Sequence, residues 1–258
     1  MNYENIRYTV SDGVATITID RPRVKNAMSL DTCKEMMDAL RKSDDDSAVR
    51  VVVLTHTGKV FTAGGDLGGY RGKPYMKFRD YAFAFKELWT LMPELKKPII
   101  AVAKGNVHGG GIGMIAACDM TVAASDVIFQ CSEINIGLFP FMVTPLLIRQ
   151  VGNKKALELM FTGNAIDAKE AKEIGLINHC VAPQEVDSLV KELTSTLANK
   201  SPSAMRMGKE TLYNVIDMPY VQALEYTAQM LVLMTFSNDG QEGVNAFLEK
   251  RRPNYEGY

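Results

Sequence analysis

The sequence predicts an α/β fold with a helical last third, and three observations carry this prediction. Strand-like segments alternate with helical segments over the first two thirds of the 258 residues. The continuous apolar run at residues 51–54 is typical of a strand buried on both faces. Several later segments have only helical periodicity. Strand, loop, helix and strand in repetition is the pattern of sheets joined by crossover helices.

The N-terminal elements are predicted from turns, caps and breakers. Polar and apolar residues alternate on both sides of Asp12-Gly13, which indicates a β-hairpin. Ser29 is a favourable N-cap for the helix that follows it. Pro93 and Pro98 separate a long helix from the next strand. These features predict strands at residues 6–10, 14–19, 51–54, 98–103 and 120–124, and helices at residues 29–41 and 75–92.

Helices are predicted in the C-terminal part at residues 154–162, 168–174, 184–198, 203–215 and 221–236. The last of these has too many apolar residues for a lone surface helix. Two interpretations stay open for it, burial in the core of its own chain or a contact between subunits. We expect a soft boundary near residue 195, which divides a core of residues 1–195 from a helical region of residues 196–258.

Composition excludes several classes of protein. The net charge is −1, whereas nucleic-acid-binding proteins usually carry an excess of basic residues. The four cysteines are scattered and the three histidines have no metal-ligand spacing, so we expect reduced thiols and no metal site. Nothing reads as a signal peptide, and no apolar run approaches membrane-spanning length. We therefore expect a cytoplasmic protein with neither nucleic-acid nor membrane partners.

The most informative segment is Gly105-Asn106-Val107-His108-Gly109-Gly110-Gly111-Ile112-Gly113, which leads from a strand into a short helix. Bare amides at a helix N-terminus suit an anion. A dinucleotide site is one reading, because residues 111–116 fit G-x-G-x-x-A and Glu133 follows further on. The long loop and short helix argue against it, and no Gly-Lys-Ser/Thr follows for a P-loop. Close packing of helix on strand would explain only one or two of the glycines.

A second glycine-rich loop, at residues 58–67, suggests another kind of anion. It also follows a buried strand, and it contains the adjacent glycines Gly64 and Gly65. If each loop gives one N–H to a shared oxygen, the two together form an oxyanion hole.

These loops belong to a set of motifs spread over the whole chain. The set comprises Asp20-Arg21-Pro22, Lys25-Asn26-Ala27-Met28, Phe61-Thr62-Ala63-Gly64-Gly65-Asp66-Leu67, Gly109-Gly110-Gly111, Cys118-Asp119, Phe129, Ser132-Glu133-Ile134, Gly137, Phe161-Thr162-Gly163, Glu242-Gly243-Val244 and Ala246-Phe247-Leu248-Glu249-Lys250-Arg251. In order and spacing the sequence resembles the crotonase (enoyl-CoA hydratase/isomerase) superfamily.

The resemblance implies an α/β fold of the crotonase type, the ClpP/crotonase spiral of ββα units with a helical C-terminal region. Residues 196–258 would serve oligomerisation and cover the active site. The resemblance also implies a homotrimer or a dimer of trimers. The expected substrate is an acyl-CoA thioester, and no cofactor is expected because coenzyme A is part of that substrate.

Matching the motifs implies a role for four residues of the reaction centre. The backbone N–H groups of Gly65 and Gly110 would bind the thioester oxygen and stabilise an enolate. Glu133 would be a catalytic carboxylate, and the apolar segment after it, residues 134–142 with Phe139, would raise its pKa. Gly113 stands where the second glutamate of the family's hydratases would be. It is read either as a lost catalytic residue or as space for a bulkier acyl group or an ordered water.

Further residues, Gly113 and Phe139 among them, are expected to bind the substrate. The loops with Lys25, Ala27, Ala63 and Asp66 would cradle coenzyme A, and Phe247 and Lys250 would approach its 3′-phosphate end. Lys250 can equally be a solvated charge. His108 precedes the glycines and is a candidate second acid or base, although a loop histidine is more often only hydrogen-bonded.

One carboxylate without its partner favours an enoyl-CoA isomerase, because a Δ3,Δ2 shift of a double bond needs a single proton shuttle. An enoyl-CoA hydratase that uses Glu133 and a held water is the second possibility. A non-catalytic acyl-CoA-binding homologue is the third.

Overall fold

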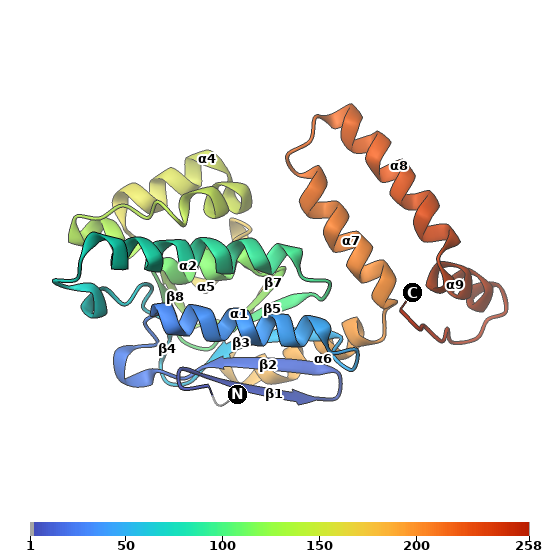
Figure 1. The fold of residues 1–258 in the computed structure, drawn as a ribbon, viewed down its shortest axis with the longest axis horizontal. Helices are drawn as coiled ribbons and strands as arrows, with labels where there is room; N and C mark the ends of the chain where they lie inside the picture. Colours follow the sequence, from blue (N-terminus) through green and yellow to red (C-terminus); the bar gives the residue numbers. More distant parts are fainter. Residues whose placement is uncertain (1–2, 258) are drawn as a thin grey trace.

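The computed structural model describes residues 3–257 and contains two sheets, with helices on both sides of the larger one (Figure 1). The strands are β1 (Ile6–Ser11), β2 (Val14–Ile19), β3 (Val51–His56), β4 (Val60–Thr62), β5 (Ile99–Ala103), β6 (Asn106–His108), β7 (Met120–Ala124), β8 (Ile128–Gln130), β9 (Ala165–Asp167) and β10 (His179–Val181). The α-helices are α1 (Leu30–Asp45), α2 (Tyr75–Glu94), α3 (Gly110–Ala117), α4 (Thr144–Thr162), α5 (Ala168–Glu173), α6 (Val186–Ala198), α7 (Pro202–Val215), α8 (Tyr220–Phe236) and α9 (Asn238–Leu248).

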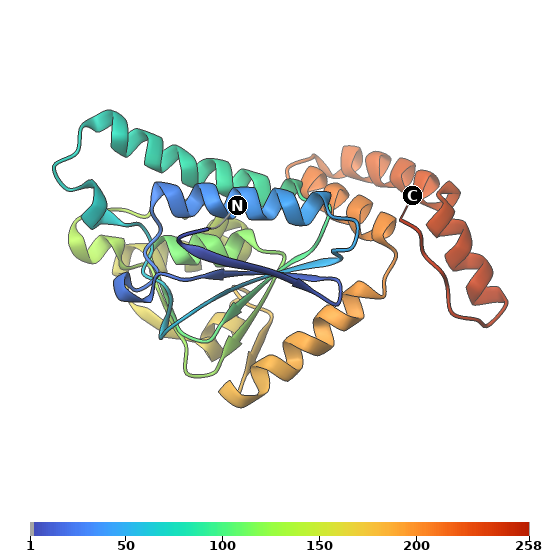
Figure 2. The ribbon, with the colours of Figure 1, turned by 60° about the horizontal axis from the view of Figure 1, so that its bottom comes forward.

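The larger sheet has the strand order β1-β2-β3-β5-β7-β10. Strands β1 and β2 form the expected antiparallel hairpin, and the remaining pairs are parallel. All five residues of β5 are buried, because helices α1 and α2 cover one face of the sheet and α6 lies on the other (Figure 2). The continuous apolar runs of the central strands follow from this coverage.

The smaller sheet has the strand order β4-β6-β8-β9, and the sequence did not predict it. Each of its strands has only three residues, too few for a recognisable alternation. Strands β4, β6 and β8 follow β3, β5 and β7 directly along the chain, and a helix comes after each pair. The chain therefore repeats a ββα unit three times and adds one strand to each sheet in every repeat.

Several helices differ from the predicted bounds. Helix α2 continues through Pro93 to Glu94. Helix α4 begins ten residues earlier than expected, at Thr144, and changes direction at Gly152, where φ is 75°. That non-helical residue interrupts the periodic pattern, so only the second half was recognised. Helix α9 was not predicted, because Gly240 and Gly243 lower the helical propensity of its segment.

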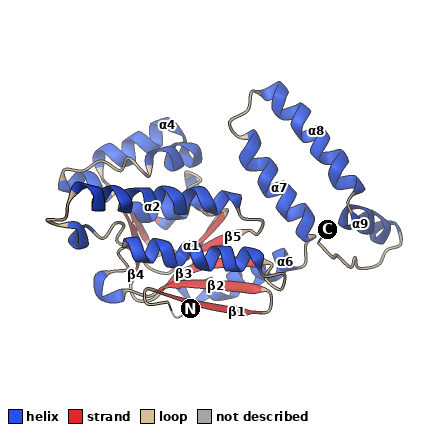
Figure 3. Ribbon diagram, viewed as in Figure 1, coloured by secondary structure: helices blue, strands red, loops and turns tan. Residues whose placement is uncertain are grey.

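The C-terminal helices α7, α8 and α9 project from the body (Figure 3). Lys209 and Tyr213 of α7 anchor them, with a 2.7 Å ion pair and a 3.0 Å hydrogen bond to Asp119. Helix α8 has no buried residue, so the reading that it lies in the core of its own chain is wrong. The expected boundary at residue 195 falls in the last turn of α6, which still packs on the sheet.

Between residues 3 and 257, no helix is long and apolar enough to cross a membrane. In the same range, no three histidine, cysteine, aspartate or glutamate side chains lie together in a way that would hold a metal ion.

Candidate active site

The fold brings the two predicted glycine loops into direct contact. A Cβ on Gly64 would stand 2.8 Å from the amide nitrogen of Gly110, and a Cβ on Gly110 would stand 3.9 Å from that of Gly65. Gly64 and Gly109 also have φ angles of +85° and +53°, a region that residues with a side chain rarely adopt. Glycine is therefore required for two reasons: the backbone of these loops has positive φ angles, and the two loops approach each other too closely for a side chain.

The amides of Gly65 and Gly110 are both available to a ligand. Gly110 is the first residue of α3, so its N–H has no partner within the helix. Gly65 faces Met28 in an isolated parallel bridge, in which the bonds run from Met28 N to Gly64 O and from Asp66 N to Met28 O. The N–H of Gly65 consequently points away from that bridge. Within the described part of the chain, neither amide donates a hydrogen bond.

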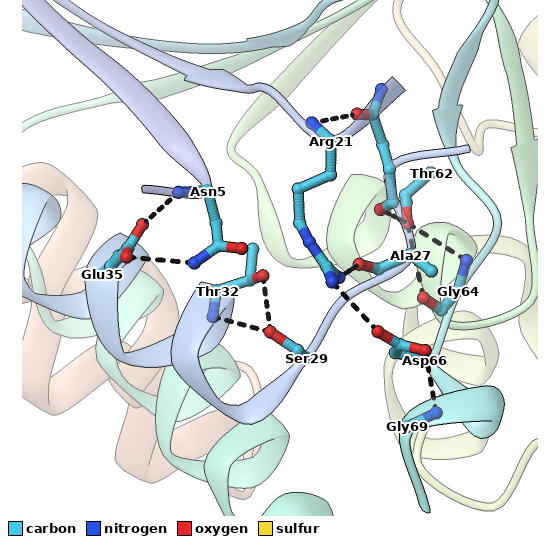
Figure 4. A network of polar contacts seen from close by, with 11 residues as sticks. Asn5, Arg21, Ala27, Ser29, Thr32, Glu35, Thr62, Gly64, Asp66 and Gly69 are labelled. Carbon is cyan, nitrogen blue, oxygen red and sulfur yellow. Dashed lines mark hydrogen bonds and ion pairs between the residues drawn. The ribbon is translucent and has the colours of Figure 1, made fainter. Parts of the chain in front are cut away.

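A polar network fixes the glycine loop at residues 58–67 (Figure 4). Thr62 Oγ1 donates to Asn26 O at 2.7 Å and accepts from Gly64 N at 3.1 Å. The buried Asn26 side chain donates to the carbonyls of Thr57 and Val60, both at 2.7 Å. These bonds hold the segment around Asn26 against the Gly64 turn.

Arg21 and Asp66 complete the network. The guanidinium of Arg21 donates to Ala27 O and forms a 3.1 Å ion pair with Asp66. Asp66 also accepts from Gly69 N at 3.2 Å, which caps the short helical turn Leu67–Tyr70. The side chain of Asp66, expected to bind substrate, is thus engaged in fixing the loop, because both of its oxygens already have protein partners.

Glu133 lies beside the glycine loop at residues 105–113, on the turn Ser132–Ile136. A Cβ on Gly109 would stand 3.1 Å from Glu133 Oε1. The other oxygen, Oε2, is buried and has no hydrogen-bond partner among the described residues. Burial raises the pKa of Glu133, and a hydrogen bond from its own N–H offsets the rise only in part. The carboxyl group next to the two free amides is therefore easier to protonate than an exposed one.

Only half of the apolar wall predicted for Glu133 is shielded from solvent. Ile136 and Phe141 are 62% and 76% exposed, and Leu138 is also exposed. Phe139 is partly buried and packs on Phe141 and Phe161, with ring centroids 5.1 and 5.8 Å apart. The direction of the pKa shift agrees with the prediction, but three of the six apolar side chains of that wall are exposed.

Three aromatic residues of α2 reach the glycine loops, and the sequence reasoning missed them. Tyr81 overlaps the Cβ position of Gly65, Phe85 Cε1 lies 3.7 Å from that of Gly110, and Trp89 Cη2 lies 2.5 Å from that of Gly113. All three rings are at least 94% buried. Their spacing of four residues on one helix face was the signal available in the sequence.

Trp89 overturns one reading of Gly113. Three atoms of its indole ring lie within 3.1 Å of the position of a Gly113 Cβ. This space is therefore filled by protein and does not hold a bulkier acyl group or an ordered water.

The remaining predicted residues are divided between two parts of the molecule. Lys25, Ala27 and Ala63 lie at the Gly64 turn, where Ala63 N donates to Lys25 O at 3.0 Å. Phe247 lies in the last turn of α9, and Lys250 follows that helix by two residues. In both views this helix is on the other side of the molecule from the Gly64 turn (Figures 1 and 2). One protomer therefore does not bring Phe247 and Lys250 to Gly65, Gly110 and Glu133.

His108 ends strand β6, just before the glycines. Burial lowers its pKa, and a hydrogen bond with the Gln130 side chain opposes this effect. The imidazole is consequently biased toward its neutral form.

Known proteins are similar to this chain over nearly its whole length. Residues 9–258 match the sequence model of the enoyl-CoA hydratase/isomerase family. The chain is 34% identical to the crotonyl-CoA hydratase of Syntrophomonas wolfei, with 99% of each chain covered. It is 31% identical to the short-chain-enoyl-CoA hydratase of Clostridium acetobutylicum, with 98% of this chain and 97% of the relative covered.

Solved structures give the same result. The fold superimposes on enoyl-CoA hydratase from Bacillus anthracis with a TM-score of 0.94, at 31% identity over 99% of this chain and 100% of the other. Human enoyl coenzyme A hydratase domain-containing protein 3 gives a TM-score of 0.95 at 28% identity over 98% and 100% of the two chains. The chain therefore has the crotonase fold and belongs to the enoyl-CoA hydratase/isomerase family of enzymes.

Proposed function

We propose that this protein is an enoyl-CoA isomerase that moves a double bond from the Δ3 to the Δ2 position with Glu133 as its single acid/base. One observation carries the proposal. The ring of Trp89 fills the space beside Gly113, so the site has neither a carboxylate nor room for one at that position. A 1,3-proton shift needs one base that takes up a proton and returns it, whereas two carboxylates are suited to delivering a proton and activating a water.

The reaction begins when the thioester oxygen of a 3-enoyl-CoA accepts hydrogen bonds from the N–H groups of Gly65 and Gly110. These donors stabilise the negative charge that develops on the oxygen. Glu133 then removes a proton from carbon 2, which gives a dienolate with its charge on the thioester oxygen. Return of the same proton to carbon 4 leaves the double bond between carbons 2 and 3. The raised pKa of Glu133 supports both steps, because the group has to accept and release a proton near neutral pH.

Hydration of a 2-enoyl-CoA is the second candidate. The observation in its favour is that two relatives at 34% and 31% identity are named as enoyl-CoA hydratases. In this reaction Glu133 would activate a water that adds to carbon 3 and would then supply the proton to carbon 2. A single carboxylate would perform both tasks.

We further propose that the protein works as a homotrimer or a dimer of trimers. Helix α8 exposes a long apolar surface, which includes Leu224 at 52% and Leu231 at 68% exposure. Surfaces of this kind on a folded chain mark protein contacts. In such an assembly Phe247 and Lys250 would approach the coenzyme A of a neighbouring subunit, because they are remote from the site of their own chain.

Turnover of 3-enoyl-CoA and of 2-enoyl-CoA separates the two reactions. Isomerase activity converts a 3-enoyl-CoA into a 2-enoyl-CoA, so the conjugated-thioester absorbance of the product appears. Hydratase activity consumes a 2-enoyl-CoA, so the same absorbance disappears. Glu133→Gln should abolish the activity found, and Glu192→Gln on the exposed face of α6 should leave it unchanged. Hydration without isomerisation would overturn the first proposal. Tight binding with no turnover of either substrate would leave only the non-catalytic reading.

A further inference from the structure

We propose that the hydroxyl group of Tyr81 is a third hydrogen-bond donor in the oxyanion hole and acts as a catalytic group beside the amides of Gly65 and Gly110. This inference rests on the proposed function, because it assumes a thioester oxygen in that hole. It concerns a side chain of α2, a helix in which none of the expected site residues lies.

The position of the Tyr81 hydroxyl is the first argument. The oxygen overlaps the place where a Cβ of Gly65 would stand, and the ring carbon Cζ lies 3.2 Å from that place. A Cβ is about 2.5 Å from the amide nitrogen of its own residue, as standard bond lengths and angles require. The hydroxyl oxygen therefore lies next to the Gly65 amide, within reach of an oxygen atom that this amide binds.

The surroundings of Tyr81 hold its ring in this position. The ring is 95% buried and meets Phe85 edge-on, with centroids 5.1 Å apart and an interplanar angle of 90°. Phe85 in turn packs on Trp89 at 5.2 Å and reaches the Cβ position of Gly110. The three rings form one row of edge-to-face contacts along α2, which spans the site from Gly65 to Gly113. Because its neighbours fix the ring, the hydroxyl needs little reorganisation when charge develops.

The chemistry of a phenol suits this task. A tyrosine hydroxyl keeps its proton near neutral pH and can donate without changing its ionisation state. A site with one carboxylate depends strongly on enolate stabilisation, since no second acid assists the proton transfer. The inference also explains why residue 65 is glycine, because any side chain there would displace the hydroxyl from the hole.

Tyr81→Phe removes only the oxygen and keeps the ring, which makes it the direct test. We expect kcat for enoyl-CoA to fall by about 10²–10³-fold, the usual effect of losing one oxyanion donor, with little change in KM. Tyr75→Phe is the matched control, because Tyr75 belongs to the same helix and is 77% exposed. A thermal unfolding curve for both variants shows that the fold is retained.

A spectroscopic readout separates catalysis from structural support. The absorbance of a bound conjugated dienoyl-CoA shifts to longer wavelength when hydrogen bonds polarise its carbonyl group. Tyr81→Phe should reduce this shift, whereas Tyr75→Phe should leave it as in the unmodified protein. An unchanged shift and an unchanged kcat in Tyr81→Phe would overturn the inference.

The failure of this inference is distinguishable from failure of the proposed function. If Glu133→Gln is inactive and Tyr81→Phe keeps full activity, the proposed reaction stands and the role of Tyr81 is wrong. If the unmodified protein turns over no enoyl-CoA, the proposed reaction is wrong. The dienoyl-CoA shift then still decides whether Tyr81 donates to the bound thioester.

Discussion

The indole ring of Trp89 occupies the space that a side chain on Gly113 would need. Its Cη2 and Cζ2 atoms lie 2.5 and 2.8 Å from the Cβ position, closer than non-bonded carbon atoms normally approach. The pair joins α2 to α3 and fixes their separation. The ring therefore lies where the family resemblance implies a second carboxylate in the hydratases.

Gly113→Glu alone should therefore destabilise the protein and should not create a hydratase. Overpacking of a core commonly costs about 1–3 kcal/mol, and the charge of the new carboxylate adds to this. Trp89→Ala opens the space, so Gly113→Glu should cost less in the Trp89→Ala background. A double-mutant cycle of unfolding free energies should give a coupling of about 0.5–3 kcal/mol.

A control for this cycle is available on α7. A Cβ on Gly208 has no atom within 4 Å, so Gly208→Glu should be tolerated. Additive effects of the Gly113 and Trp89 substitutions would contradict the packing relationship.

The activity should depend on pH through the ionisation of Glu133. The base has to be ionised to accept a proton, so kcat/KM should fall as the pH drops through its pKa. Because burial raises that pKa, the fall should lie above the ordinary glutamate value of about 4.3. Rate profiles from pH 4 to 9 would measure it. A limb at the ordinary value would show that Glu133 is solvated or that another group is the base.

The same carboxyl group should make stability depend on pH. Since its folded pKa is raised, its contribution to stability is complete below the unfolded pKa and is lost as the pH rises through the folded pKa. Glu133→Gln should therefore raise the unfolding free energy at pH 7, and the gain should shrink toward pH 4. Glu192→Gln provides the baseline, as an exposed substitution of the same type. An equal effect of Glu133→Gln at both values would argue against a buried ionised carboxylate.

The sequence predicted the larger sheet better than the rest of the fold, for a physical reason. The central strands are buried on both faces, and burial gives them continuous apolar runs such as β5. The three-residue strands of the smaller sheet, such as β4, are too short for such a run. They are recognisable as strands only through their pairing with neighbouring strands in the fold. The first half of α4 was missed for another reason: the kink at Gly152 interrupts the helical periodicity.

The candidate site was predicted through motifs rather than through contacts. Local glycine patterns and a family resemblance indicated Gly65, Gly110 and Glu133, which the fold does bring together. Tyr81 and Trp89 were missed, because their significance depends on how α2 packs on the two loops. A helical aromatic pattern alone is equally consistent with an ordinary core. Gly65 and Gly113 leave room for aromatic rings that are far from them in sequence. Such a pairing of a glycine with a ring is recognisable only in the folded structure.

A charge introduced on the apolar face of α8 should weaken the proposed contact of this helix with another subunit. Leu224 and Leu231 are seven residues apart, so they share one face of the helix, and neither is buried within its own chain. Leu231→Glu should leave the isolated chain folded but disfavour an assembly that buries this face, because an unpaired carboxylate is costly to bury. Light scattering after size-exclusion chromatography should then report a lower mass than for the unmodified protein. Gln222→Glu, on the same helix, adds the same charge at an already polar position and should leave the mass unchanged. A monomeric unmodified protein, or equal masses for both variants, would rule out α8 as the contact.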